Sequence, residues 1–326
     1  MKLKSLFVIT TMFLTTIASA QDTAETNLSM KFTEVTDGIY MVEGRGGNIG
    51  LSIGNDGILM IDDQFANASE ELMNQIKKKS KKPIQFLVNT HHHGDHTGGN
   101  ANFAKEGAVI VSHENVRKHL NETLNNATEK TATTSDAMLP TITFNEDLNF
   151  YYNGEKVMVF HVHNAHTDGD GVVYFTESNV IHTGDVFFNG RYPYIDAENG
   201  GSLKGYLEAL EKIMLLADAD TKIIPGHGKL ASKIDLQEAR NMLSLVYKRV
   251  TMQYLNKKTE DEVAAMTDIT AEFDAKGYGT GYISTERMLR FVYQEIIRER
   301  GAIDNRTMQE RLDDKVREYN EQQGKN

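Results

Sequence analysis

The sequence has 326 residues, no cysteine and a formal net charge of −11. Binding to nucleic acid depends on neutralising phosphates with Lys and Arg, so a chain this acidic predicts no nucleic-acid partner. Without cysteine no disulfide can form, and any soft metal ion must be held by histidines and carboxylates alone.

The first twenty residues have the pattern of a cleavable export signal. Lys2 and Lys4 give a basic start, Leu6 to Ile17 form an apolar run, and small residues end the segment at Ala20. The apolar run is shorter than the roughly 20 residues that span a bilayer, and no later run is long enough, so we expect no membrane anchor after cleavage. We therefore expect a periplasmic or secreted protein cut after Ala20, with 33 basic and 46 acidic residues left and a net charge of −13.

Short strand-like runs alternate with turns through the first two thirds of the chain. Residues 51–53 and 58–61 flank Gly54-Asn55-Asp56-Gly57, which predicts a hairpin because Gly and Asn tolerate positive φ. Apolar residues at helical spacing predict a helix over 69–79. Further strands are expected at 38–42, 84–88, 108–112, 148–152, 156–163, 171–175 and 180–183.

After Gly228 the pattern becomes helical. Helices are expected over 234–255, over 285–299 and after Asp304, with a glycine-rich turn at 277–281. Strands alternating with helices and then a helical tail indicate a mixed α/β domain with a C-terminal helical extension. We expect a leader at 1–20, a main domain at 21–232 and the extension at 233–326. The helix predicted over 234–255 carries an apolar stripe made of Leu243, Val246 and Val250. The stripe suits either dimer formation or packing on the chain's own domain, so the oligomeric state stays open.

The segment His91-His92-His93-Gly94-Asp95-His96 directly follows a predicted strand. In an extended segment His91 and His93 point the same way, so both can reach one metal ion. Asp95 and His96 follow a glycine that lets the chain turn, so they can face a second ion. Isolated ligands recur in turns after later strands, where loops on a rigid scaffold place functional groups: His166, Asp185 and His227. A chance cluster in a solvated turn would not repeat in this way, and the pattern predicts a two-metal site.

These motifs resemble those of the metallo-β-lactamase superfamily, from about Thr33 to Leu230. Asp62 matches the family's opening Asp, and residues 91–96 match its H-x-H-x-D-H signature. The resemblance implies an αββα four-layer sandwich, with two zinc ions held at one edge between the sheets. It assigns His91, His93 and His166 to the first ion and Asp95, His96 and His227 to the second, with Asp185 bridging both as in glyoxalase II-like members. The best-known β-lactamase subclass has a Cys at that bridging position, so this site looks like an all-His/Asp hydrolase site.

The ligand set predicts hydrolysis by a shared hydroxide. Two ions about 3.5–4 Å apart acidify a bridging water to a pKa of roughly 7, and Asp95 orients it for attack on a carbonyl. The expected substrate is a small cyclic amide or ester, of which a β-lactam is the most nameable. Zinc is the expected metal, although His and Asp also accept iron or manganese.

Three other activities stay open: a glyoxalase II-like thioesterase, a lactonase, and an iron oxidoreductase on the same fold. Export argues against glutathione thioesters, which are mostly intracellular. The flavodiiron signature has Glu where this chain has His93, and seven ligands exceed what a mononuclear dioxygenase uses.

The remaining candidates are supporting residues. Asp62 and His182 are expected to orient ligands through hydrogen bonds. The stretch after Asp185 either packs in the core or forms a wall of the substrate pocket, with contacts from Phe187, Asn189, Arg191 and Tyr192. Structural or surface roles are expected for His92, His113, His161 and His163. Aromatic residues of the tail, Tyr278 and Tyr282 among them, are expected to pack a helix onto the domain.

Overall fold

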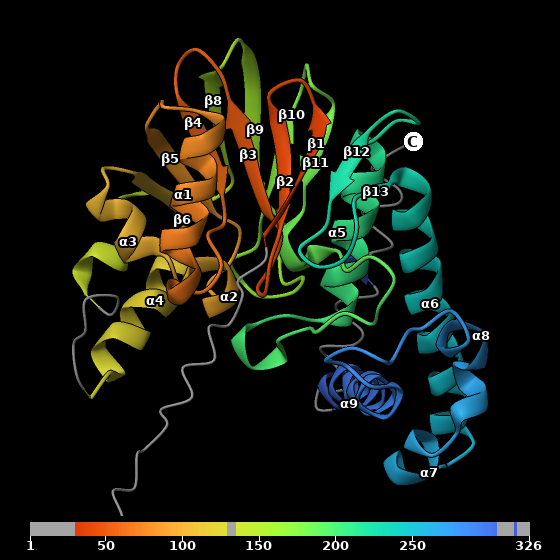
Figure 1. Ribbon diagram of the computed structural model, residues 1–326. Helices are drawn as coiled ribbons and strands as arrows, with labels where there is room; N and C mark the ends of the chain where they lie inside the picture. Colours follow the sequence, from red (N-terminus) through yellow and green to blue (C-terminus); the bar gives the residue numbers. More distant parts are fainter. Residues whose placement is uncertain (1–29, 129–134, 305–315, 318–326) are drawn as a thin grey trace, which may run out of the picture.

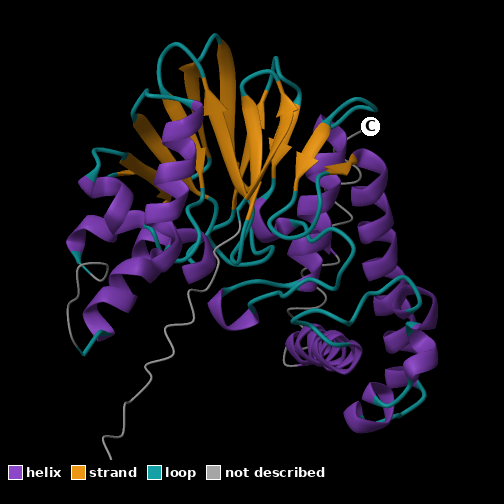
Figure 2. Ribbon diagram, in the orientation of Figure 1, coloured by secondary structure: helices purple, strands orange, loops and turns teal. Residues whose placement is uncertain are grey.

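The computed structural model describes residues 30–128, 135–304 and 316–317. Two β-sheets pack face to face, and helices cover the outer face of each, which gives the predicted αββα sandwich (Figures 1 and 2). The predicted leader lies outside the described residues, as does nearly all of the segment after Asp304. No helix in the described part of the chain is long and apolar enough to cross a membrane.

The first sheet has seven strands in sequence order. Its first four strands are antiparallel, and the predicted hairpin joins the third and fourth. The last three run parallel to the fourth, so their carboxyl ends share one edge. The strands are β1 (Lys31–Thr36), β2 (Ile39–Glu43), β3 (Ile49–Ile53), β4 (Ile58–Ile61), β5 (Ile84–Asn89), β6 (Val109–His113) and β7 (Ile142–Phe144).

The second sheet has six strands in the order β13-β12-β11-β10-β9-β8. Only the β11–β12 pair is parallel. Valine, isoleucine and phenylalanine side chains from both sheets form the core between them, including Val88 and Phe175. The strands are β8 (Asp147–Tyr152), β9 (Glu155–His161), β10 (Gly171–Phe175), β11 (Val180–His182), β12 (Lys222–Ile224) and β13 (Ala231–Ser232).

Helices on the first sheet follow its parallel strands. The helix predicted over 69–79 forms over those residues as α1, and it buries Leu72 and Ile76 against the sheet. Two acidic residues, Glu70 and Glu71, lie in its first turn and three lysines lie in its last turn, and both match the helix dipole. The helices are α1 (Ser69–Lys79), α2 (Gly94–Thr97), α3 (Asn100–Lys105) and α4 (Glu114–Asn126).

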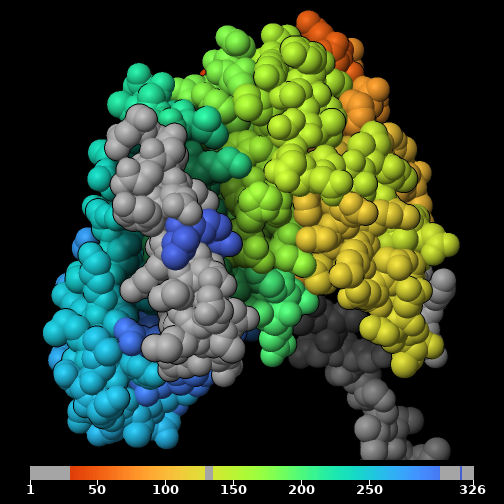
Figure 3. All heavy atoms as spheres, turned by 180° about the vertical axis from the view of Figure 1, so that it is seen from behind, coloured from red at the N-terminus to blue at the C-terminus, as the bar shows by residue number. Residues whose placement is uncertain are grey.

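The C-terminal helices share one core with the second sheet. Leu243, Val246 and Val250 are buried there with Leu210 of α5, so the apolar stripe of the tail packs on the chain's own domain. Seen from behind, these helices and the first-sheet region form opposite sides of the molecule (Figure 3). The helices are α5 (Leu203–Leu216), α6 (Lys233–Leu255), α7 (Glu260–Ala264), α8 (Ala271–Asp274) and α9 (Thr285–Asp304).

Candidate metal centre

The histidine-rich segment lies at the carboxyl end of β5, at the edge where the two sheets meet. Asn89 and Asn100 exchange two side-chain hydrogen bonds of 3.0 and 2.9 Å, which hold the segment's two ends together. His93 precedes α2, and its carbonyl accepts the N–H of Thr97. The short helix places Asp95 and His96 in a second ligand group with His227, although the His96 ring stays 4.2 Å from that of His91.

The first group of ligands consists of three histidines and one carboxylate: His91, His93, His166 and Asp185. Nδ1 of His93 lies 3.1 Å from Nε2 of His91 and 2.9 Å from Nε2 of His166. Oδ2 of Asp185 lies 3.8 Å from Nε2 of His91 and 3.6 Å from Nε2 of His166. Tetrahedral zinc with Zn–N bonds of about 2.0–2.1 Å would set its nitrogens about 3.3 Å apart, close to these spacings.

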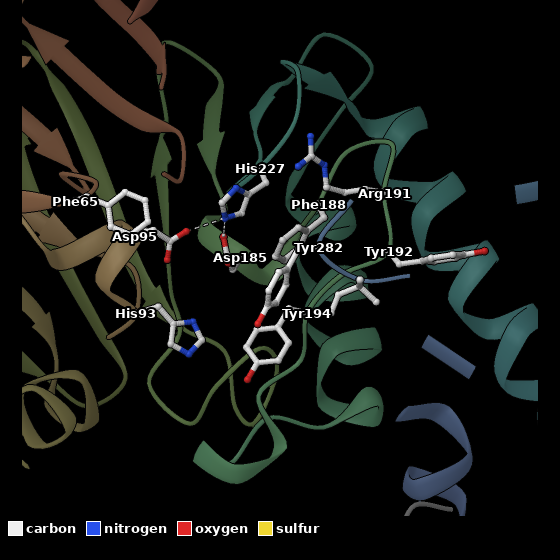
Figure 4. A pocket seen from close by; sticks show the side chains of 11 residues that line it. Phe65, His93, Asp95, Asp185, Phe188, Arg191, Tyr192, Tyr194, His227 and Tyr282 are labelled. Atoms are coloured by element: carbon white, nitrogen blue, oxygen red, sulfur yellow. Dashed lines mark ion pairs between the residues drawn. The ribbon is translucent and has the colours of Figure 1, made fainter. Parts of the chain in front are cut away.

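The second group is richer in carboxylates and consists of Asp95, His96 and His227, with the other oxygen of Asp185. Oδ1 of Asp185 lies 3.1 Å from Nε2 of His96 and 3.4 Å from Nε2 of His227. Oδ2 of Asp95 lies 3.2 Å from Nε2 of His227 (Figure 4). Asp185 therefore directs one oxygen to each group, as expected of a bridging ligand.

His93 and His166 each make a hydrogen bond with the ring nitrogen that faces away from the ligand group, which leaves the inward-facing nitrogen unprotonated. Nε2 of His93 donates to Oδ2 of Asp196 at 2.9 Å, and Nδ1 of His166 donates to the carbonyl of Tyr194 at 2.8 Å. In the neutral rings, the two nitrogens that face each other then both carry lone pairs. Such an arrangement is unfavourable without a cation between them.

Two polar atoms of the second group are also buried without a hydrogen bond: Nε2 of His96 and Oδ1 of Asp185. They are close but not aligned for hydrogen bonding. Gly226 and Gly47 leave room for them, because a Cβ at Gly226 would lie 2.0 Å from Oδ1 of Asp185 and one at Gly47 2.0 Å from the His96 ring. The donor set and its unpaired inward atoms fit two metal ions, one in each group.

The two groups differ in their charge preference. Burial, together with the neighbouring histidines His96 and His93, lowers the pKa of His166 to about 4 against the effect of Asp185. Burial also opposes protonation of His227, but Asp185 and Asp95 outweigh it and raise the pKa of His227 to about 9. Burial acts the same way on His96, where Asp185 and Asp62 raise the pKa.

Asp62 occupies the position predicted for an orienting carboxylate. It has φ +60° and accepts the backbone N–H and hydroxyl of Thr90 at 2.8 and 2.7 Å. Its Oδ2 lies 2.7 Å from Nδ1 of His96, which points Nε2 of that ring into the site. His182 acts one step further away: it accepts the N–H of Gly184, next to Asp185, and donates to the Asn48 carbonyl.

Asp196 is a supporting residue that sequence reasoning missed. It is buried, and it holds His93 as Asp62 holds His96. Although burial raises the pKa of Asp196, hydrogen bonds from His93 and Asn199 hold it well below its usual range. The sequence did offer one indication of this role: Asp196 lies in the stretch after Asp185 that was predicted to line the pocket, three residues before Asn199, with which it forms a local turn.

A cavity of about 440 Å³ opens above the two groups. Figure 4 shows Phe65 on one side and Phe188, Tyr194 and Tyr282 on the other, with metal-group residues between them. Arg191 and Tyr192 also line it, as predicted, although the Tyr192 hydroxyl points away and donates to Asp274 at 2.9 Å.

Two predicted substrate contacts lie elsewhere. Phe187 is buried in the core of the second sheet, because the short helical turn at Asp185 directs its ring inward and Phe188 to the cavity. Asn189 does not line the cavity; it donates to the carbonyl of Lys229 at 3.1 Å and so holds the loop beside His227. The prediction for Tyr282 is also wrong, since its side chain stands at the cavity with 73% exposure.

The remaining histidines lie outside the two groups, as predicted from the sequence. His92 stacks on His119 with ring centroids 4.3 Å apart, and burial is the main cause that lowers its pKa to about 3. His113 stacks on His161 at 3.9 Å, and His163 lies beside them on the surface.

An αββα sandwich with a His/Asp cluster at the edge between its sheets defines the metallo-β-lactamase class of proteins. The chain belongs to the metallo-β-lactamase superfamily, whose family model matches residues 43–227. Members of this superfamily are mostly hydrolytic enzymes.

Relatives within the family carry different names. The alpha subunit of 2,4-dinitroanisole O-demethylase from Nocardioides sp. is 25% identical over 48% of this chain and 44% of its own length. An alkyl/aryl-sulfatase of Saccharomyces cerevisiae is 32% identical over 26% of this chain and 14% of its own length. The chain therefore spans less than half the length of both relatives.

Solved structures show the same fold. A metallo-β-lactamase from Pontibacter korlensis has a TM-score of 0.57 and 20% identity, with 66% of this chain and 99% of that chain covered. A stereoselective inverting sec-alkylsulfatase from Pseudomonas sp. has a TM-score of 0.66 and 18% identity, with 81% of this chain and 50% of that chain covered. The sulfatase match thus extends over more of this chain than the β-lactamase match.

Proposed function

We propose that this protein is a dinuclear metal hydrolase, with zinc in both positions, that cleaves a small cyclic amide or ester. The observation that carries the proposal is Asp185, which directs Oδ2 to the three-histidine group and Oδ1 to the carboxylate-rich group. One residue serving two ligand sets is the arrangement expected of a two-metal site.

Bound in these two groups, divalent ions would acidify a water as the nucleophile and polarise a carbonyl oxygen. Asp95 lies at the floor of the cavity. Burial raises the pKa of its carboxyl, but His96 and His227 outweigh that effect and lower it. Asp95 is therefore ionised at neutral pH, and we assign it the role of accepting a hydrogen bond from the attacking water.

The cavity supports a small-molecule substrate. Its volume of about 440 Å³ is in the range of ligand pockets, and its walls are mostly aromatic. A β-lactam is the substrate we propose first, with lactones and thioesters as alternatives. Arg191 lines the cavity on the His227 side and is proposed to pair with an anionic group of the substrate (Figure 4).

A second candidate is hydrolysis of a sulfate ester. It is favoured by the solved sec-alkylsulfatase, whose fold matches 81% of this chain against 66% for the β-lactamase.

We also propose that the protein is exported and cut after Ala20, which N-terminal sequencing of the mature protein would test.

The test is turnover by metal-analysed protein of nitrocefin, a lactone, a thioester and an alkyl sulfate, side by side. Asp95→Asn keeps the shape of the side chain but removes its charge, and should lower turnover of the true substrate by roughly 10²-fold or more. Asp37→Asn makes the same change in an exposed turn and serves as the matched control. Turnover that survives Asp95→Asn would contradict the mechanism. No turnover of any of the four, with about two ions bound per chain, would overturn the substrate classes.

A further inference from the structure

The C-terminal extension reaches the cavity of the metal centre. Tyr282 and Ile283, in the turn before α9, line the cavity together with residues of the main domain. Both lie beyond residues 43–227, which the family model matches. In Figure 4 the Tyr282 ring stands beside Tyr194, across the cavity from Phe65.

Tyr282 is exposed but held in place. The guanidinium of Arg287 lies 4.5 Å from its ring centroid, and Nη1 of the same Arg donates to the Tyr282 carbonyl at 2.8 Å. The ring also makes an edge contact with Tyr194, with centroids 5.9 Å apart and planes at 86°. An exposed aromatic ring that is fixed from two sides is preorganised to contact a ligand.

Tyr194 continues this wall down to the metal centre. Its ring centroid lies 5.8 Å from that of His93 and 5.8 Å from that of His166. Tyr282, Tyr194 and the first ligand group therefore form a continuous surface from the mouth of the cavity to its floor.

Asp274 fixes this wall to the main domain. Its Oδ1 accepts the hydroxyls of Tyr192 at 2.9 Å and Thr285 at 2.7 Å, and its Oδ2 accepts that of Thr270 at 2.8 Å. One carboxylate thus joins the loop that follows Asp185 to the first residue of α9. This network fixes the start of α9, and Arg287 and Tyr194 hold the Tyr282 ring that precedes it.

We propose that Tyr282, Tyr194 and Phe65 form an aromatic subsite, which makes the C-terminal extension a determinant of substrate specificity. The subsite selects a substrate with an aryl or bulky alkyl group next to the reacting bond, since aromatic faces and edges gain most from such groups. Phe65 is 42% exposed, so it is free to cover the opposite face of that group. The inference rests on the proposed function for the position of the reacting bond.

The test measures binding, so that it does not depend on turnover. Isothermal titration calorimetry with 4-phenylbutyrate and with butyrate, on the zinc-loaded full chain and its Asp95→Asn variant, gives the preference for the phenyl group. Tyr282→Ala should weaken binding of 4-phenylbutyrate by roughly 5- to 30-fold and that of butyrate by less than about twofold. Tyr282→Phe should keep the preference. Tyr151→Ala removes a Tyr that is 80% exposed on β8, outside this cavity, and is the matched control.

Equal weakening of both ligands by Tyr282→Ala, or no weakening of either, would overturn the subsite. A phenyl preference that depends on Tyr282 in a protein that hydrolyses none of the four substrates supports the subsite and rejects the proposed function. Hydrolysis that depends on Asp95, without any phenyl preference in binding, supports the proposed function and rejects the subsite.

Discussion

The two ligand groups of the candidate metal centre, its first and second halves, hold their histidines in different protonation states. In the first half, burial and neighbouring rings lower the pKa of His91 and bring that of His166 to about 4, so these ligands are neutral at physiological pH. In the second half, carboxylates raise the pKa of His227 to about 9, against the effect of burial. Histidine binds metal only when its nitrogen is free of a proton.

The two halves therefore differ in protonation before a metal ion binds. The first half offers lone pairs that already face each other, whereas the second half holds protons in place of the ion. Metal binding at the second half must therefore release protons, and its affinity should rise more steeply with pH. The first half should fill at lower pH, with little proton release.

Removing the residue that the halves share should have the largest effect. Asp185→Ala takes one oxygen from each group, and we expect the metal content to fall from about two ions to one or fewer, with kcat lowered roughly 10³-fold or more. Asp185→Asn keeps an oxygen ligand and should lose less. Metal analysis and steady-state kinetics on the same preparations give the result, and two bound ions with near-normal turnover in Asp185→Ala would rule out the bridging role.

Changing one orienting carboxylate at a time should separate the halves. Asp62→Asn acts on His96, and Asp196→Asn acts on His93, through hydrogen bonds of 2.7 and 2.9 Å. Each should weaken metal binding roughly 10- to 100-fold. Asp62→Asn should act on the second half, and Asp196→Asn on the first half. Chelator competition followed at several pH values gives the affinities. The assignment fails if both variants weaken the same, pH-dependent binding step.

The smallest effect concerns the metal-free protein in alkaline solution. Because the pKa of His227 is raised from 6.5 to about 9 in the folded state, its ion pairs stabilise the fold fully below pH 6.5. That contribution is lost as the pH rises through 9, and we expect a loss of about 1–2 kcal/mol in the free energy of unfolding, since the ring is partly exposed. Urea unfolding between pH 6 and 10 measures it.

His227→Gln provides the control for this alkaline loss. The variant has no titrating ring at that position, so its metal-free stability should change less over the same pH range. The zinc-loaded protein should also lack the loss, because a metal ion replaces the proton. An identical alkaline loss in the variant would assign the effect to another group.

Local patterns in the sequence predicted a mixed α/β domain and a two-metal site, whereas the resemblance to the superfamily supplied the αββα sandwich and the full assignment of the ligands. The helix over 69–79 and the hairpin around residues 54–57 were predicted from nearest neighbours alone, and both form there. The position of Asp196 depends instead on a contact with His93, 103 residues earlier, for which no local pattern exists. Tyr282 was assigned to packing because its neighbours are aromatic, whereas contacts with Arg287 and with the distant Tyr194 hold its ring at the cavity.

Asn48 has a consequence for the order in which the molecule folds. Its side chain, directly before β3 of the first sheet, donates to the carbonyls of Pro225 and Gly228, which are 177 and 180 residues later. The segment with His227 is therefore held against the first sheet only after nearly the whole main domain has been made. The first group is complete once Asp185 has been made, whereas the second group stays incomplete until the segment with His227 has been added, so the second site can form only after the first.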